Sequence, residues 1–145
     1  MESVQAIPKS PKLKLDFKDS KYATGRRKKS IAKVWIKKGN GNIHVNGMKM
    51  NEYFKRPVHQ IIVTRPLEIT QVSSNYDVKC SVKGGGLSGQ AGAIILGISK
   101  ALIAHDENLK KNLKKDKLTT RDSRVVERKK YGHRKARRSF QFSKR

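Results

Sequence analysis

Acidic residues are scarce in this sequence. Its 145 residues include 11 Asp and Glu against 35 Lys and Arg, which gives a formal net charge of +24. The acids are scattered, and no group of them has the spacing that a metal-dependent nuclease needs. Self-repulsion at this charge disfavours a compact chain unless a polyanion compensates it. The composition therefore favours nucleic-acid binding over catalysis.

Cysteines, histidine pairs and long apolar runs are lacking too. Cys80 is the single cysteine, which excludes a disulfide framework and a thiolate metal cluster and favours a reducing, intracellular compartment. The four histidines form no H-x-x-x-H pair, and Ser88 lacks the second glycine of a hydrolase elbow. The longest apolar stretch, residues 91–104, is interrupted by Lys100 and is too short to span a bilayer. We therefore expect no catalytic residues, metal, cofactor or membrane association.

The basic residues are concentrated in two runs. Residues 21–38 carry eight basic residues and no acid, and residues 110–145 carry 16 against three acids. Between them, residues 39–109 hold seven basic residues and five acids. For any single lysine, a solvated surface position is the simpler interpretation. Two separate runs around a nearly neutral middle indicate a surface for a polyanion.

This distribution predicts three parts. Residues 1–21 form a flexible N-terminal extension, residues 22–118 a compact α/β RNA-binding body, and residues 119–145 a basic C-terminal tail. The tail has too few apolar residues to fold alone, since burial cannot offset the entropy of ordering its backbone. Basic residues in it neutralise phosphates, and its aromatic residues either stack on bases or pack on protein.

Alternating patterns in the middle of the chain predict a small sheet. Apolar and polar residues alternate over residues 30–37 and again over residues 77–83, which is typical of half-buried strands. The turn residues 39–42 predict that the first strand folds back on residues 43–46 as a hairpin, with the basic residues 26–29 at its root.

Helices are expected at residues 51–54, 58–63 and 88–104. Pro66 breaks the second helical pattern, so residues 67–70 are expected to resume as a strand. In the third helix, apolar residues at helical spacing predict deep burial. Asp106 is placed to cap a short basic helix that follows.

A glycine-rich motif at residues 84–89 matches the dinucleotide fingerprint G-x-G-x-x-G. Three observations oppose that function. The preceding strand is amphipathic, the acids Asp106 and Glu107 fall at the end of the helix, and a lysine run follows in place of a second strand. We expect the glycines to permit a tight turn and a close approach of helix to sheet. The helix N-terminus remains available to one RNA phosphate.

Three groups of motifs follow one another from Tyr22 to the last residue. The first is YATGRRKKSIAKVW at 22–35, with GNG at 39–41, VNG at 45–47 and YF at 53–54. The second is VKGGGLSGQAGAI at 82–94 with GISKAL at 97–102. The third is TRDSRVVERKKYG at 120–132, KARR at 135–138 and QFSKR at 141–145. In this order they resemble the small-subunit ribosomal protein nine family, in its bacterial or organellar form. Residues 1–20 lie outside the resemblance.

The resemblance implies an α+β fold of two layers. A mixed four-stranded sheet has helices packed on one face, with a left-handed crossover and a long, extended basic C-terminal tail. It implies a non-enzymatic structural constituent of the small ribosomal subunit. The implied partners are rRNA of the head (the 3′ major domain), neighbouring head proteins and the peptidyl-site tRNA, with no membrane and no free homo-oligomer. The implied location is the ribosome of a bacterial cytoplasm or a mitochondrial matrix.

The resemblance also implies roles for individual residues. The implied rRNA contacts are Arg26, Arg27, Lys28, Lys29, Arg121, Arg124, Arg128, Lys129, Lys130, Arg134, Lys135, Arg137 and Arg138. The terminal Lys144 and Arg145 are implied to approach the anticodon stem-loop of the peptidyl-site tRNA. Extended from Tyr131, the last 15 residues reach about 50 Å.

Other residues keep two interpretations. Asp122 and Glu127 are expected to pair with arginines inside the protein. Trp35, on the same strand face as two lysines, is either a platform that faces RNA or is covered by the N-terminal extension. Phe140 and Phe142 either stack on bases or pack on a neighbouring protein or on riboses.

Two other functions compete with a ribosomal one. A histone-like DNA-packaging protein would explain the charge, but not the glycine-shaped α/β body with a single tail. A nucleotide-dependent enzyme would explain the glycines, but not the tail or the scarcity of acids.

Overall fold

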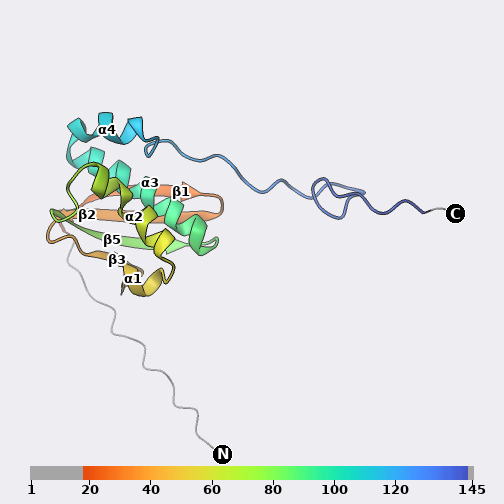
Figure 1. The fold of residues 1–145 in the computed structure, drawn as a ribbon, viewed down its shortest axis with the longest axis horizontal. Coiled ribbons are helices and arrows are strands. Elements are labelled where there is room, and N and C mark those ends of the chain that lie inside the picture. Colours follow the sequence, from red (N-terminus) through yellow and green to blue (C-terminus); the bar gives the residue numbers. More distant parts are fainter. Residues whose placement is uncertain (1–17, 144–145) are drawn as a thin grey trace, which may run out of the picture.

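The structure is a computed structural model that describes residues 18–143 (Figure 1). One mixed sheet has five strands: β1 (Lys21–Arg27), β2 (Ser30–Lys38), β3 (Ile43–Val45), β4 (Met48–Lys49) and β5 (Tyr76–Lys83). The helices are α1 (Met50–Tyr53), α2 (Pro57–Ile69), α3 (Leu87–His105), the 3-10 turn η1 (Glu107–Leu109) and α4 (Lys110–Lys115). The predicted α+β fold, with helices on one face of a mixed sheet, is confirmed. The sheet has five strands where four were expected.

The alternating residues of β2 and β5 divide between the two faces of the sheet as predicted. In β2, Ala32, Val34 and Ile36 are fully buried, while Lys33 on the other face is exposed. In β5, the odd-numbered positions 77–81 are partly exposed between buried neighbours. Because a strand turns successive side chains to opposite faces, the buried set forms the floor of the core beneath the helices.

The predicted hairpin between β2 and β3 is wrong, because β5 lies between them in the strand order β1-β2-β5-β3-β4. The turn before β3 is held by the start of β5. The Asp77 carboxylate accepts hydrogen bonds from the backbone N–H groups of Asn40 (3.0 Å) and Asn42 (2.8 Å). The chain therefore crosses the end of β5, and β3 pairs with it in parallel. The hairpin partner of β2 is β1, which the sequence suggested only as a basic approach.

The predicted strand at residues 67–70 is also wrong, because α2 continues through Pro66 to Ile69. Proline lacks the N–H group that a helix interior uses, so it normally ends or kinks a helix. Here burial outweighs that loss, since Pro66 and Leu67 extend the apolar stripe that Val63 begins. The C-terminus of the helix is also satisfied, because the hydroxyl of Thr70 donates to the Pro66 carbonyl at 2.8 Å.

Helix α3 is the core helix and packs directly on β1 and β2. Two glycines permit this approach. A Cβ at Gly25 in β1 would overlap the Ala93 carbonyl oxygen, and a Cβ at Gly97 would lie 2.5 Å from a methyl carbon of Val34. By length and composition α3 could cross a membrane, but most of it is buried inside the protein. Its apolar character is therefore explained by the core.

After α3 the chain closes the body and then leaves it. The Asp106 side chain accepts from the Asn108 N–H at 3.0 Å, as the capping prediction requires, and the basic helix α4 follows. Leu113 is buried completely and Leu118 nearly so. From Thr119 to Ser143 the chain has no helix or strand, apart from an isolated bridge between His133 and Ser139. Figure 1 shows this segment running away from the body, with a closed loop before its end.

Candidate nucleic-acid interface

The turn of the β1–β2 hairpin presents four consecutive basic residues. Arg26, Lys28 and Lys29 are exposed, and Arg27 is partly buried. The alternation of β1 directs Arg27 toward α3, where its side chain lies across Gly92; a Cβ at Gly92 would overlap the Arg27 Cδ. A small residue on the helix thus fixes where this guanidinium lies. The predicted contacts 26–29 come together at one end of the sheet.

A groove of about 420 Å³ lies between this hairpin, the helices and the root of the tail. Its charged lining residues are Arg26, Arg27, Arg65, Lys117, Asp122 and Arg124. Nη2 of Arg27 lies 3.4 Å from Oδ2 of Asp122, which ties the tail root to β1. The Nε of Arg27 is buried and has no hydrogen-bond partner among the described residues. A groove with this surplus of cations is suited to an anionic ligand.

Asp122 is the acid that organises the tail root. It accepts two parallel hydrogen bonds from Arg124, Nε to Oδ1 at 3.0 Å and Nη2 to Oδ2 at 2.9 Å, and a third from the Arg124 backbone N–H at 3.1 Å. These bonds, the side-chain ones above all, hold the pKa of Asp122 well below its usual range. The expected internal pairing of Asp122 with arginine is confirmed. This acid therefore stays ionised and shapes the cationic surface around it.

Glu127 organises the tail in the same way. Its carboxylate contacts Lys130 Nζ at 2.7 Å and Arg137 Nε at 2.9 Å, and these two contacts lower the pKa of Glu127. The same part of the chain closes on itself through the bridge of His133 and Ser139. We call residues 127–140 the tail loop. The expected pairing of Glu127 is confirmed, but the tail is not extended throughout, because this loop folds back.

The aromatic residues of the tail are exposed. Tyr131 keeps 94% of its surface accessible and Phe142 keeps 88%. Arginines lie over two of the rings: Arg128 Cζ is 6.0 Å from the Tyr131 ring centroid, and Arg134 Cζ is 5.4 Å from that of Phe140. Cations over rings are favourable contacts, and both rings keep more than half of their surface accessible.

The other predicted contact residues are placed as follows. Those of the tail are all exposed: Arg121, Arg124, Arg128, Lys129, Lys130, Arg134, Lys135, Arg137 and Arg138. The structure brings Arg124 together with Arg26 and Arg27 in one groove, whereas the residues of the tail loop lie apart from that groove. Lys144 and Arg145 lie outside the described residues.

The sequence was compared with models of known protein families. The model of the family described as ribosomal protein S9/S16 matches residues 25–145. The chain belongs to this family. It is a structural protein of the small ribosomal subunit, RNA-binding and part of the translation apparatus, and its place is the ribosome. The family is in general non-enzymatic.

In this S9/S16 protein the groove, the hairpin turn and the tail loop all lie within the matched residues. Sequence reasoning missed two groove residues, Arg65 and Lys117. Arg65 was placed next to an expected helix break, and continuation of α2 through Pro66 is what carries it to the groove. Lys117 is one of many lysines in a run, so no local signal separates it from its neighbours.

The glycine-rich motif of the S9/S16 protein has a structural role. Gly84 and Gly85 adopt φ of +73° and +63°, which lets β5 turn into α3. The hydroxyl of Ser30 donates to the Gly84 carbonyl at 3.1 Å, so the turn is tied to β2. After α3 the described chain continues as η1 and α4, where a dinucleotide fold needs a parallel strand. Among residues 18–143, no group of three or more His, Cys, Asp or Glu is placed to hold a metal ion.

Proposed function

We propose that this protein binds rRNA of the small-subunit head through two neighbouring cationic surfaces, the groove at the tail root and the tail itself. The groove carries the proposal, because five of its six charged lining residues are cationic and the sixth, Asp122, is already bonded to Arg124. A phosphate bound there would offset the surplus positive charge. The hairpin turn, residues 26–29, continues the same surface.

The tail supports the proposal through charge that the protein does not neutralise. Residues 119–143 contain nine Lys or Arg and two acids, and each acid already contacts two cations. The remaining cations are exposed and have no acid within the described tail to pair with. Arginine binds phosphate in a planar, bidentate manner, so these residues recognise the RNA backbone, with little readout of base sequence.

The salt dependence of binding tests the tail. The variant Arg134→Gln, Lys135→Gln, Arg137→Gln and Arg138→Gln removes four charges from the tail loop. The matched control removes four charges from α4, at Lys110, Lys111, Lys114 and Lys115, which are also exposed. If each tail residue neutralises one phosphate, the slope of log K against log salt falls by about three to four for the tail variant. A slope that falls as much in the α4 control would show general charge attraction only.

The choice of ligand tests the class of partner. Folded rRNA of the small-subunit head, duplex DNA of equal length and a dinucleotide are compared as ligands for the full chain. We expect the folded rRNA to bind tightest and to lose roughly 10³–10⁵ in affinity between low and moderate salt if six to ten phosphates are contacted. Dinucleotide binding that is insensitive to salt, or a preference for duplex DNA, would exclude the proposal.

We further propose that the tip of the tail, Lys144 and Arg145, contacts the anticodon stem-loop of the peptidyl-site tRNA. The direction of the described tail, away from the body, supports this (Figure 1). Deleting both residues should leave assembly into the subunit intact and weaken tRNA binding to the peptidyl site. The control Lys114→Gln, Lys115→Gln loses the same charge elsewhere. Failed assembly, or unchanged tRNA affinity, would remove any separate role for the tip.

We also propose that the chain consists of three parts. Residues 22–118 would be the folded, RNA-binding body and residues 119–145 the tail, a boundary supported by Leu118 as the last buried apolar residue of the described chain. Residues 1–21 would be a flexible N-terminal extension whose last residue, Lys21, begins β1; residues 1–17 lie outside the described residues. The proposed home is a bacterial-type ribosome, in a bacterial cytoplasm or a mitochondrial matrix.

A further inference from the structure

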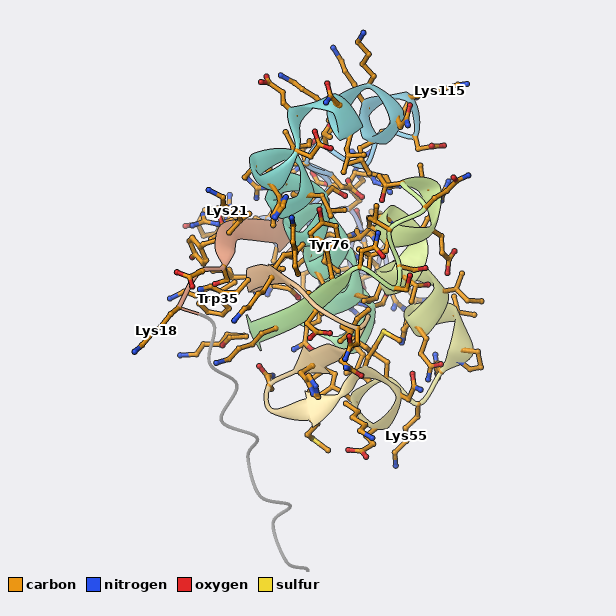
Figure 2. The ribbon with its side chains drawn as sticks, turned by 90° about the vertical axis from the view of Figure 1, so that its left-hand side faces the viewer. Lys18, Lys21, Trp35, Lys55, Tyr76 and Lys115 are labelled. Carbon is orange, nitrogen blue, oxygen red and sulfur yellow. The ribbon has the colours of Figure 1, made fainter. Side chains whose placement is uncertain are left out.

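The face of the sheet opposite the helices carries an ordered row of rings and cations. Across β1, β2 and β5, Tyr22 is paired with Trp35, and Trp35 with Lys79. One step along the strands, Lys33 is paired with Ser81 on the same face. Figure 2 shows Trp35 on the side of the strands away from α2. Neither the groove nor the tail contributes to this surface.

Trp35 is held in place by its neighbours on both sides. The ring centroids of Tyr22 and Trp35 are 5.3 Å apart, with an angle of 42° between the planes, and Lys79 Nζ lies 6.0 Å from the Trp35 ring centroid. Tyr22 is 49% exposed and Trp35 is partly exposed. Because β1 and β5 pair with β2 in fixed register, the two rings and the ammonium group are arranged before any partner binds.

The charge around the rings is positive. Lys33 and Lys37 flank Trp35 along β2, one two residues before it and one two residues after it, and Lys83 ends β5 on the same face. Asp77, an acid on this face, accepts hydrogen bonds from N–H groups of the turn before β3, which hold it at the sheet end. Rings among several cations suit a polyanion whose units have exposed π faces. Unpaired RNA has that chemistry, whereas a duplex keeps its bases stacked inside.

We propose that this face binds an unpaired segment of RNA. We call it the sheet platform and define it by Tyr22, Lys33, Trp35, Lys79 and Lys83. A base stacks on the Trp35–Tyr22 rings, while the lysines contact the flanking phosphates. The inference rests on the proposed function and adds a second, stacking-based contact surface to it.

Trp35 is the single tryptophan of the chain, so its fluorescence reports on the sheet platform without labelling. The full chain is titrated with an unpaired oligoribonucleotide of about ten nucleotides and with an RNA duplex of the same length, while binding is followed separately by anisotropy of labelled RNA. The unpaired strand should quench Trp35 emission in proportion to binding. The duplex should bind through the tail and leave the emission unchanged.

Substitutions at the platform test the stacking contact. Trp35→Ala should weaken binding of the unpaired strand by about 5- to 100-fold, while Trp35→Phe, which keeps a ring, should retain most of the affinity. Lys33→Gln with Lys83→Gln should weaken it more than the matched pair Lys110→Gln with Lys111→Gln on α4. Thermal unfolding of each variant identifies any loss of fold. If Trp35→Ala is unstable, Trp35→Phe and the double variant Lys33→Gln, Lys83→Gln still test the platform.

The outcomes separate this inference from the proposed function. If the chain binds RNA with tail-dependent affinity but Trp35 emission and the platform variants show no effect, the platform does not bind RNA and the proposed function stands. If the tail variant binds rRNA as well as the unmodified chain, the proposed function fails instead. If deletion of residues 1–17 changes the emission and RNA does not, the chain's own extension covers the rings, and the inference is overturned.

Discussion

The contact between Gly25 of β1 and helix α3 gives the sharpest prediction on stability. A methyl group at Gly25 would overlap the carbonyl oxygen of Ala93 and lie 2.6 Å from the backbone nitrogen of Gly97. Both obstacles are main-chain atoms of one buried helix, so no side-chain rotation can relieve the overlap. The strand cannot retreat either, because β1 is paired to β2 along its whole length. Gly25→Ala must therefore separate the sheet from its core helix.

The size of the effect follows from these contacts. Overpacking a core typically lowers the free energy of unfolding by about 1–3 kcal/mol, and contacts with main chain place this change at the upper end, about 3 kcal/mol. For a chain of this length that corresponds to a fall in Tm of roughly 12 °C. Separation of β1 from α3 also moves Arg27, so the groove should lose affinity for RNA along with stability.

Gly86 provides the matched control. A Cβ there meets nothing within 4 Å, and its φ of −99° suits any residue. Alanine is a poorer helix N-cap than glycine, but it also restricts the unfolded chain, so the two effects leave Gly86→Ala within about 1 kcal/mol of the unmodified protein. Urea unfolding, followed by circular dichroism and Trp35 fluorescence, measures both variants. Equal midpoints for Gly25→Ala and Gly86→Ala would refute the reasoning.

Three further predictions concern the interface and the core. Gly92→Ala should preserve the fold, since the flexible end of Arg27 can move, but it should displace the Arg27 guanidinium from Asp122. Heteronuclear NMR of the arginine Nε–H resonances should show this displacement, and an unchanged Arg27 resonance would contradict it. The pKa of Glu127 is lowered from its ordinary value of 4.5. Its ionised carboxylate therefore stabilises the tail loop fully above pH 4.5, and this stabilisation is lost as the pH falls through the lowered pKa of the folded chain. Glu127→Gln should open the loop at neutral pH, visible as lost cross-loop nuclear Overhauser effects, and a loop that persists would exclude this role. Burial raises the pKa of Cys80 far above its ordinary range, so alkylation should proceed only at the rate of unfolding, and rapid labelling of the folded chain would contradict the burial.

The sequence predicted features that depend on neighbouring residues. The alternation of apolar and polar residues in β2 and β5 depends only on adjacent residues, and it predicts the buried face of each strand directly. The order of the strands could not be predicted in this way. Turn residues before β3 suit a hairpin, but the carboxylate of Asp77, 35 residues away from Asn42, decides that the chain crosses β5. A contact of that kind leaves no local pattern.

The same distinction holds for the interface. Runs of basic residues and the motif series identified the hairpin turn and the tail, because both are continuous in sequence. The groove is not continuous. Arg65 comes from α2 and Lys117 from the turn after α4, and Pro66 gave a misleading signal beside Arg65. Local propensity predicted a break, and the burial of Pro66 against the core outweighed it.

The tail loop changes what determines the length of the tail. The bridge holds His133 and Ser139, six residues apart, about 5 Å from each other, whereas six extended residues span about 20 Å. The loop therefore stores about 15 Å of chain, which opening would add to the distance between the body and the last residues. Glu127 holds both Lys130 and Arg137 at the base of this loop. The contacts of this one carboxylate therefore influence how far the last residues lie from the body.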